Sequence, residues 1–222
     1  MKNLLFIVLA IAAIVQANPE QPQQDEHSGL YFGCGAGFTH ASISHLDILS
    51  DTERYNGIGP YADLRLGWTL SRKTSIHGTL SASTMTISYF HTNDGLFGDN
   101  SSYSSRAPYY RLFVGGGATF YPVKNPNAKM SGLHIGVSLG YLTYNAENSG
   151  SYAGFKLNGK GLGTILEFGK TWKIGEHWGI GIGETNTIGL FGKETSYSPG
   201  HSSDGGFLGL MSFGIQAKIT RR

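Results

Sequence analysis

The sequence predicts an all-β protein: an eight-stranded antiparallel up-and-down transmembrane β-barrel. Three observations favour this fold class. Apolar residues alternate with polar or small ones over eight stretches, which is the period of a β-strand. Short and long connections alternate between those stretches. Beyond residue 17, no segment has the run of about 18 apolar residues that a transmembrane helix needs, so a membrane crossing would require a closed barrel.

The N-terminus has the features of a secretory signal peptide. Lys2 precedes an uncharged apolar stretch from Leu4 to Val15, and Val15-Gln16-Ala17 has small residues at the positions that a signal peptidase reads. The apolar stretch is too short to span a bilayer. We therefore expect a signal peptide over residues 1–17, a periplasmic N-terminal linker over 18–28 and one transmembrane β-barrel domain over 29–222.

Composition and charge narrow the class of protein. Charged residues make up 14% of the chain, against about 25% in typical soluble domains. The formal net charge of +2 is too small to favour nucleic acid as a partner. The single cysteine, Cys34, excludes an intramolecular disulfide and is interpreted as a small apolar strand residue.

The first predicted strand begins at Gly29. Leu30, Phe32 and Cys34 fall on one face, whereas Tyr31 and a row of glycines fall on the other. A phosphate-binding loop is the competing interpretation, but no complete G-x-G-x-x-G followed by a helix is present. We interpret the glycines as an inner wall that leaves room for large neighbours such as Tyr31, Arg65 and Arg111.

Seven further strands are predicted on the same alternation. In the seventh of the eight, Glu184 would fall on the apolar face unless a β-bulge near Gly183 resets the alternation. The seven strands cover residues 58–70, 75–90, 109–121, 132–144, 161–172, 178–190 and 207–219.

The connections predict the orientation of the barrel. Short ones cover residues 71–74, 122–131 and 173–177, and long polar ones cover 41–56, 91–108, 145–160 and 191–206. Short periplasmic turns and long extracellular loops are typical of outer-membrane barrels. Beside the short turns, Trp68, Trp172 and Trp178 are expected to form an interface aromatic girdle. Candidates for the opposite girdle are Tyr89, Phe90, Tyr109, Tyr110 and Tyr144.

From Ser28 to Ile219 the layout resembles the small eight-stranded outer-membrane barrels of the OmpA/OmpX type. The resemblance is one of architecture, without a shared sequence motif. It implies a location in the outer membrane of a Gram-negative cell, with outer-membrane lipid and the barrel-assembly machinery as partners. Barrels of this type commonly end in an aromatic residue, whereas this chain ends in Ile219-Thr-Arg-Arg222.

Charged residues on the polar faces form the candidate site. A cation facing lipid near the middle of the membrane costs about 2 to 4 kcal/mol, so these side chains should point inward. An eight-stranded barrel is just wide enough for side chains to fill it, which favours a plugged lumen. The expected lumen charge network comprises Asp63, Arg65, Arg111, Glu167 and Lys218, beside the inward-pointing His77, His134 and Gln216.

These features predict an integral outer-membrane protein with a structural or surface-interaction role. Its loops are rich in Ser, Tyr, Gly and Asn, a composition suited to binding an extracellular ligand. The alternatives are a narrow pore for small solutes, a lipid-modifying enzyme using a pair such as Ser88 and His91, and a soluble lipocalin-like ligand-binding barrel. We expect no enzyme activity and no cofactor. We also expect no metal, since His40, His45, His91 and His201 lack metal-ligand spacing.

Overall fold

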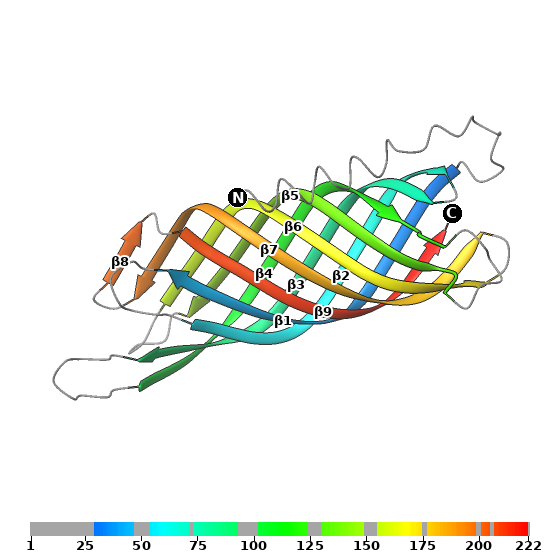
Figure 1. The fold of residues 1–222 in the computed structure, drawn as a ribbon. Helices are drawn as coiled ribbons and strands as arrows, with labels where there is room; N and C mark the ends of the chain where they lie inside the picture. The colour runs from blue at the N-terminus through cyan, green and yellow to red at the C-terminus, as the bar shows by residue number, and fades with distance from the viewer. Residues whose placement is uncertain are drawn as a thin grey trace.

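A computed structural model describes residues 29–46, 54–71, 73–92, 102–123, 130–148, 155–174, 177–198, 201–204 and 207–221. The predicted signal peptide and linker lie outside the described residues. The described part contains nine β-strands (Figure 1). They are β1 (Gly29–Leu46), β2 (Arg54–Ser71), β3 (Thr74–Thr92), β4 (Ser102–Phe120), β5 (Leu133–Asn148), β6 (Phe155–Ile174), β7 (Trp178–Ser198), β8 (His201–Asp204) and β9 (Phe207–Arg221).

Eight of these strands close into an antiparallel barrel, which confirms the predicted fold class. The order is β6-β5-β4-β3-β2-β1-β9-β7, and a β6–β7 pairing closes the ring. The short β8 pairs with the end of β7 as an added hairpin (Figure 1). Because the ring has eight members, β2 lies opposite β6 and β4 lies opposite β9. No helix within the described residues is long and apolar enough to cross a membrane.

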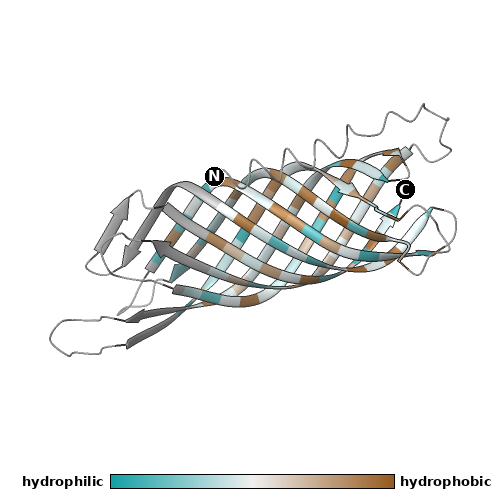
Figure 2. Cartoon of the chain, in the orientation of Figure 1, coloured by the Kyte–Doolittle hydropathy of each residue, from teal (hydrophilic) through white to brown (hydrophobic). Residues whose placement is uncertain are grey.

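The outer surface of the barrel carries a broad apolar belt. Figure 2 shows apolar positions recurring along every side of the visible wall. On β2 the belt runs from Ile58 to Leu70, and on β4 from Tyr110 to Phe120. Both stretches are at least as long as the roughly 9 to 11 residues with which a tilted strand crosses a bilayer. Leu162 is 72% exposed on this surface whereas Arg65 on the inner face is 1% exposed, so the predicted inside and outside are correct.

The strands extend further at the long-loop end than the sequence predicts. β3 and β4 remain paired up to Thr92 and Ser102, so much of the predicted loop 91–108 is strand. The short connections agree better with prediction. At one of them, Gly132 has φ of +82°, a left-handed conformation that favours glycine.

The β-bulge that the sequence analysis considered near Gly183 is not present in β7. The pairing of β7 with β6 continues without a shift through Gly183 and Glu184, so no β-bulge resets the alternation there. Glu184 therefore stays on the outer face, half-buried, and its carboxylate accepts a hydrogen bond of 2.8 Å from Asn186. A carboxylate and an amide thus interrupt the apolar belt.

Candidate functional site: the barrel interior

Glu167 on β6 is the centre of a buried ionic cluster in the lumen. Its carboxylate pairs with Arg65 Nη2 and with Lys218 Nζ. His134 Nε2 lies 2.6 Å from Oε1, and Gln216 donates to Oε2 at 3.4 Å. Side chains from β2, β5, β6 and β9 therefore meet at one carboxylate.

Asp63 extends this cluster along β2. Its Oδ2 lies 2.9 Å from Arg65 Nε, an ion pair whose angles are not those of a hydrogen bond. The glycines of β1 make room for these groups: a methyl group added at Gly35 would collide with the Asp63 carboxylate and the Gln216 amide. This contact supports the interpretation of the β1 glycines as an inner wall.

The structure brings together four of the five expected network residues. Asp63, Arg65, Glu167 and Lys218 are in contact, whereas Arg111 lies apart from both carboxylates. Arg111 Nη1 instead donates to Ser212 Oγ, and its guanidinium lies 5.7 Å from the centroid of the Tyr61 ring. The sequence places Arg111 on the inner face, but its neighbours depend on which strands face each other after closure.

Histidine, threonine and serine side chains line the wall beside the cluster. His77 lies with one ring nitrogen 3.0 Å from Thr79 Oγ1 and the other 3.0 Å from Thr119 Oγ1. Thr79 also contacts Ser138 at 3.0 Å, and the Tyr31 ring lies 5.4 Å from His77. Together with the ionic cluster, these groups form what we call the polar layer of the lumen.

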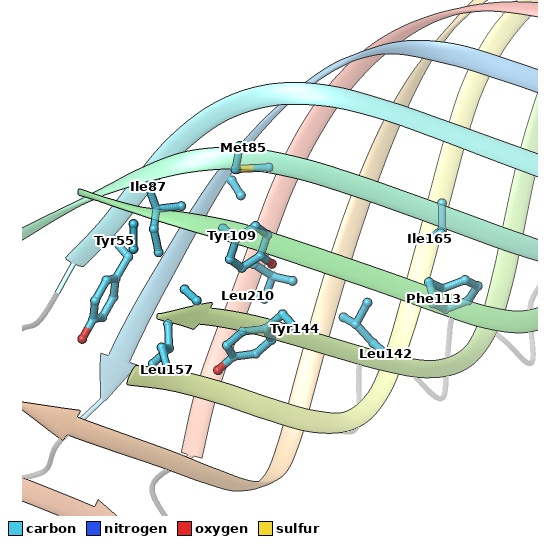
Figure 3. Close-up of a cluster of buried hydrophobic side chains, with 13 residues drawn as sticks. Tyr55, Met85, Ile87, Tyr109, Phe113, Leu142, Tyr144, Leu157, Ile165 and Leu210 are labelled. Carbon is cyan, nitrogen blue, oxygen red and sulfur yellow. The ribbon is translucent and has the colours of Figure 1, made fainter. Parts of the chain in front are cut away.

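Nearer the long-loop end, apolar side chains fill the lumen, a feature that the sequence analysis missed. Figure 3 shows them converging from several strands. The Tyr109 and Tyr144 rings are stacked, with their centroids 5.9 Å apart. This apolar layer comprises Ala41, Tyr55, Met85, Ile87, Ala107, Tyr109, Phe113, Leu142, Tyr144, Ala146, Leu157, Ile165 and Leu210.

At the long-loop end, where the lumen becomes apolar, the outer surface becomes polar. On β3, Ile76 and Leu80 face outward, but further along the strand Thr84 and Thr86 face outward and Met85 and Ile87 face inward. The β3–β4 register is continuous there, so no bulge causes the change. The apolar residues themselves move from even to odd positions, and that change of parity is the sequence signal for the apolar layer.

The aromatic girdle predicted at the long-loop end is partly wrong, because the apolar residues there change from the outer to the inner face. Tyr109 and Tyr144 are buried inside the barrel, whereas Tyr110 is 59% exposed on the outer face. The side chains of Tyr89 and Phe90 lie outside the described residues. A tyrosine one position away in a strand points to the opposite face, so composition alone does not identify a girdle residue.

The three tryptophans lie on the outer face close to the short turns. Trp68, Trp172 and Trp178 are all exposed. Lys170 Nζ lies 5.6 Å from the Trp172 ring and the Arg221 guanidinium 6.0 Å from the Trp178 ring. Amphipathic rings beside cations are typical of a membrane–water interface.

The sequence analysis considered two alternatives, a metal site built from histidines and a catalytic Ser88–His91 pair, and side-chain geometry supports neither among the described residues. Within the described part of the chain, no group of three or more potential ligands is arranged to hold a metal ion. His40 is exposed, and the side chains of His45, His91 and His201 are not described. The pairing of Ser88 with His91 therefore also lies outside the described side chains.

Comparison with known proteins supports the fold. No family model matches the chain, and no curated protein sequence matches it. Solved structures do. Neisserial surface protein A has a TM-score of 0.52 at 12% identity, covering 88% of this chain and 99% of that one. The outer membrane protein OprG from Pseudomonas aeruginosa has a TM-score of 0.51 at 14% identity, covering 88% and 96%.

The class of protein follows from these observations taken together. The chain forms a closed eight-stranded barrel with an apolar exterior and a polar interior across the belt, and its structural neighbours are outer-membrane barrels. It thus has the fold of a small, eight-stranded outer-membrane β-barrel. At these low identities the likeness concerns the fold, and the role must be argued from the site.

Proposed function

We propose that this protein is a non-conducting outer-membrane barrel that holds a surface-interaction region above the bilayer. The observation that carries the proposal is the bridge from Arg65 to Glu167. Because β2 and β6 lie opposite each other in the ring, this ion pair crosses the full width of the lumen. The contact of Arg111 with Ser212 joins another opposed pair of strands, β4 and β9.

The apolar layer supports a closed lumen as well. Tyr109, Phe113 and Leu142 have no exposed surface although they point into the barrel. Filled interiors of this kind are expected of eight-stranded barrels. A solute would have to displace both this layer and the ion pairs of the polar layer.

The reversal of polarity supports a region raised above the membrane. Beyond the belt, exposed polar residues such as Arg106, Asn145 and Glu147 surround an apolar interior, as in a water-soluble β protein. Lys156 pairs with Glu147 at 3.4 Å on this surface. β4 continues eight residues past Tyr110, or about 25 Å of strand at roughly 3.3 Å per residue. We propose that this raised barrel positions the extracellular loops for contact with a ligand.

The arrangement argues against the soluble alternative, because a lipocalin-like barrel would turn its apolar face inward along its whole length. We assign no reaction to the protein. Accordingly, cells that express it should show unchanged lipid A and phospholipid profiles. A new lipid species that depends on the protein would favour the enzyme alternative.

Conductance in planar bilayers tests the closed lumen. We expect the wild type to give no steady single-channel current. Opening both layers at once, with Arg65→Ala and Glu167→Ala in the polar layer and Phe113→Ala and Leu142→Ala in the apolar layer, should produce channels. The matched control is Lys156→Ala with Glu147→Ala, which removes an exposed ion pair and should leave the membrane silent. Steady current through the wild type would instead support the narrow pore.

A further inference from the structure

Arg111 is a buried cation that has no carboxylate partner among the side chains that the structure describes. Its side chain is 3% exposed and lies in the lumen near the boundary of the polar and apolar layers. It contacts the Ser212 hydroxyl and the face of Tyr61, both uncharged. The ion pairs found within the described residues all involve other cations. A buried charge that lacks a counter-charge is strongly destabilising.

The lumen as described has an excess of positive charge. The buried ionic residues include three cations, Arg65, Arg111 and Lys218, but only two carboxylates, Asp63 and Glu167. Both carboxylates are engaged by Arg65 or Lys218. The uncompensated charge is therefore localised at Arg111.

Polar atoms without hydrogen-bond partners surround this charge. Arg111 Nε, the Ser83 hydroxyl and the Tyr109 hydroxyl are buried and have no partner among the described residues. Ser83 pairs directly with Arg111 across β3 and β4, and Tyr109 is the next inward-facing residue along β4. An arginine N–H group and two hydroxyls can all donate. Donors gathered around a cation form a site for an anion.

We propose that Arg111, Ser83 and Tyr109 bind one small inorganic anion of the chloride class inside the lumen. Phe113, Leu142 and Tyr144 are fully buried close by, so packed side chains leave little room for a polyatomic anion. The anion would neutralise the guanidinium and accept the free hydrogen bonds. This inference goes beyond the closed-lumen proposal, since an enclosed anion is compatible with either a silent or a conducting barrel.

Thermal unfolding in detergent micelles tests the site. We compare sodium chloride with sodium gluconate at equal ionic strength, because gluconate is too large for the packed lumen. Chloride should raise the wild-type midpoint by at least about 3 °C in a saturable manner, as expected for a ligand that binds only the folded state. Arg111→Met should abolish the difference. Lys156→Met, which removes an exposed cation, should retain it.

A second variant keeps the test valid if Arg111→Met does not fold. Ser83→Ala with Tyr109→Phe removes two donors and leaves every charge in place, and it should at least halve the chloride-dependent shift. Crystals of the wild type grown in bromide should show an anomalous peak beside Arg111. Equal midpoints in chloride and gluconate, or an unchanged shift in either variant, would overturn the proposal.

Discussion

At the scale of single residues, Glu167 has the largest predicted energetic role. Its carboxylate forms ion pairs with Arg65 and Lys218 and also contacts the His134 ring. Removing one member of a buried ion pair costs about 3 to 5 kcal/mol, because it leaves uncompensated charge. Glu167→Gln should therefore lower the unfolding midpoint in micelles by roughly 6 to 20 °C. Glu147→Gln, which breaks an exposed pair, should change it little. Similar midpoints for the two variants would contradict the central role of Glu167.

Removing the charge of Glu184 is expected to stabilise the protein, in contrast to Glu167. Its carboxylate lies on the outer face between Phe168 and Ile215, its pairing partners on β6 and β9. A charge that faces lipid is unfavourable, although less so for Glu than for Lys or Arg. Glu184→Leu should therefore stabilise the barrel in lipid vesicles by about 1 kcal/mol against urea. Ile182→Leu is the matched control and should be neutral. A loss of stability would show that the hydrogen bond from Asn186 to this carboxylate outweighs the cost of a charge facing lipid.

At the scale of an element, β3 belongs to two environments. Near the short turns, Ile76 and Leu80 point outward into the apolar belt. Near the long loops, Met85 and Ile87 point inward into the apolar layer. Met85→Ala should cost about 2 to 5 kcal/mol because it leaves a cavity in the apolar layer. Thr86→Ala, one position away on the outer face, should cost far less. The measurement is urea unfolding in vesicles, and a reversed order of the two variants would refute the placement of β3.

The same strand shows how far sequence reasoning reaches. Strand period grouped Asp63, Arg65, Glu167 and Lys218 on the polar faces. The cost of a cation facing lipid then placed those faces inside. Strand period did not reveal the apolar layer, since Met85 and Ile87 alternate as regularly as Ile76 and Leu80 but in the opposite phase. Nor could it pair Arg65 with Glu167 or separate Arg111 from both carboxylates. Those contacts arise only when the ring closes and opposite strands face each other.

At the scale of the whole molecule, closure leaves no free strand edge among the eight barrel strands. Every strand of such a barrel is hydrogen-bonded to a neighbour on each side, so the barrel unfolds as one unit and resists mild detergent. Unboiled protein should therefore migrate differently from boiled protein on electrophoresis in detergent, and it should fractionate with the outer membrane. A soluble band whose mobility is unaffected by boiling would exclude the transmembrane barrel.

The two-zone arrangement, with an apolar belt in lipid and a raised barrel in water, is the central claim of this account. Cysteine labelling along the outer face of β3 tests it most directly, since Cys34→Ser provides a background without thiols. Single cysteines at Leu80, Ala82, Thr84, Thr86 and Ser88 are exposed in vesicles to a membrane-impermeant maleimide. We predict protection at Leu80 and Ala82 and full labelling at Thr86 and Ser88. Uniform labelling along the strand, or protection throughout, would contradict the account.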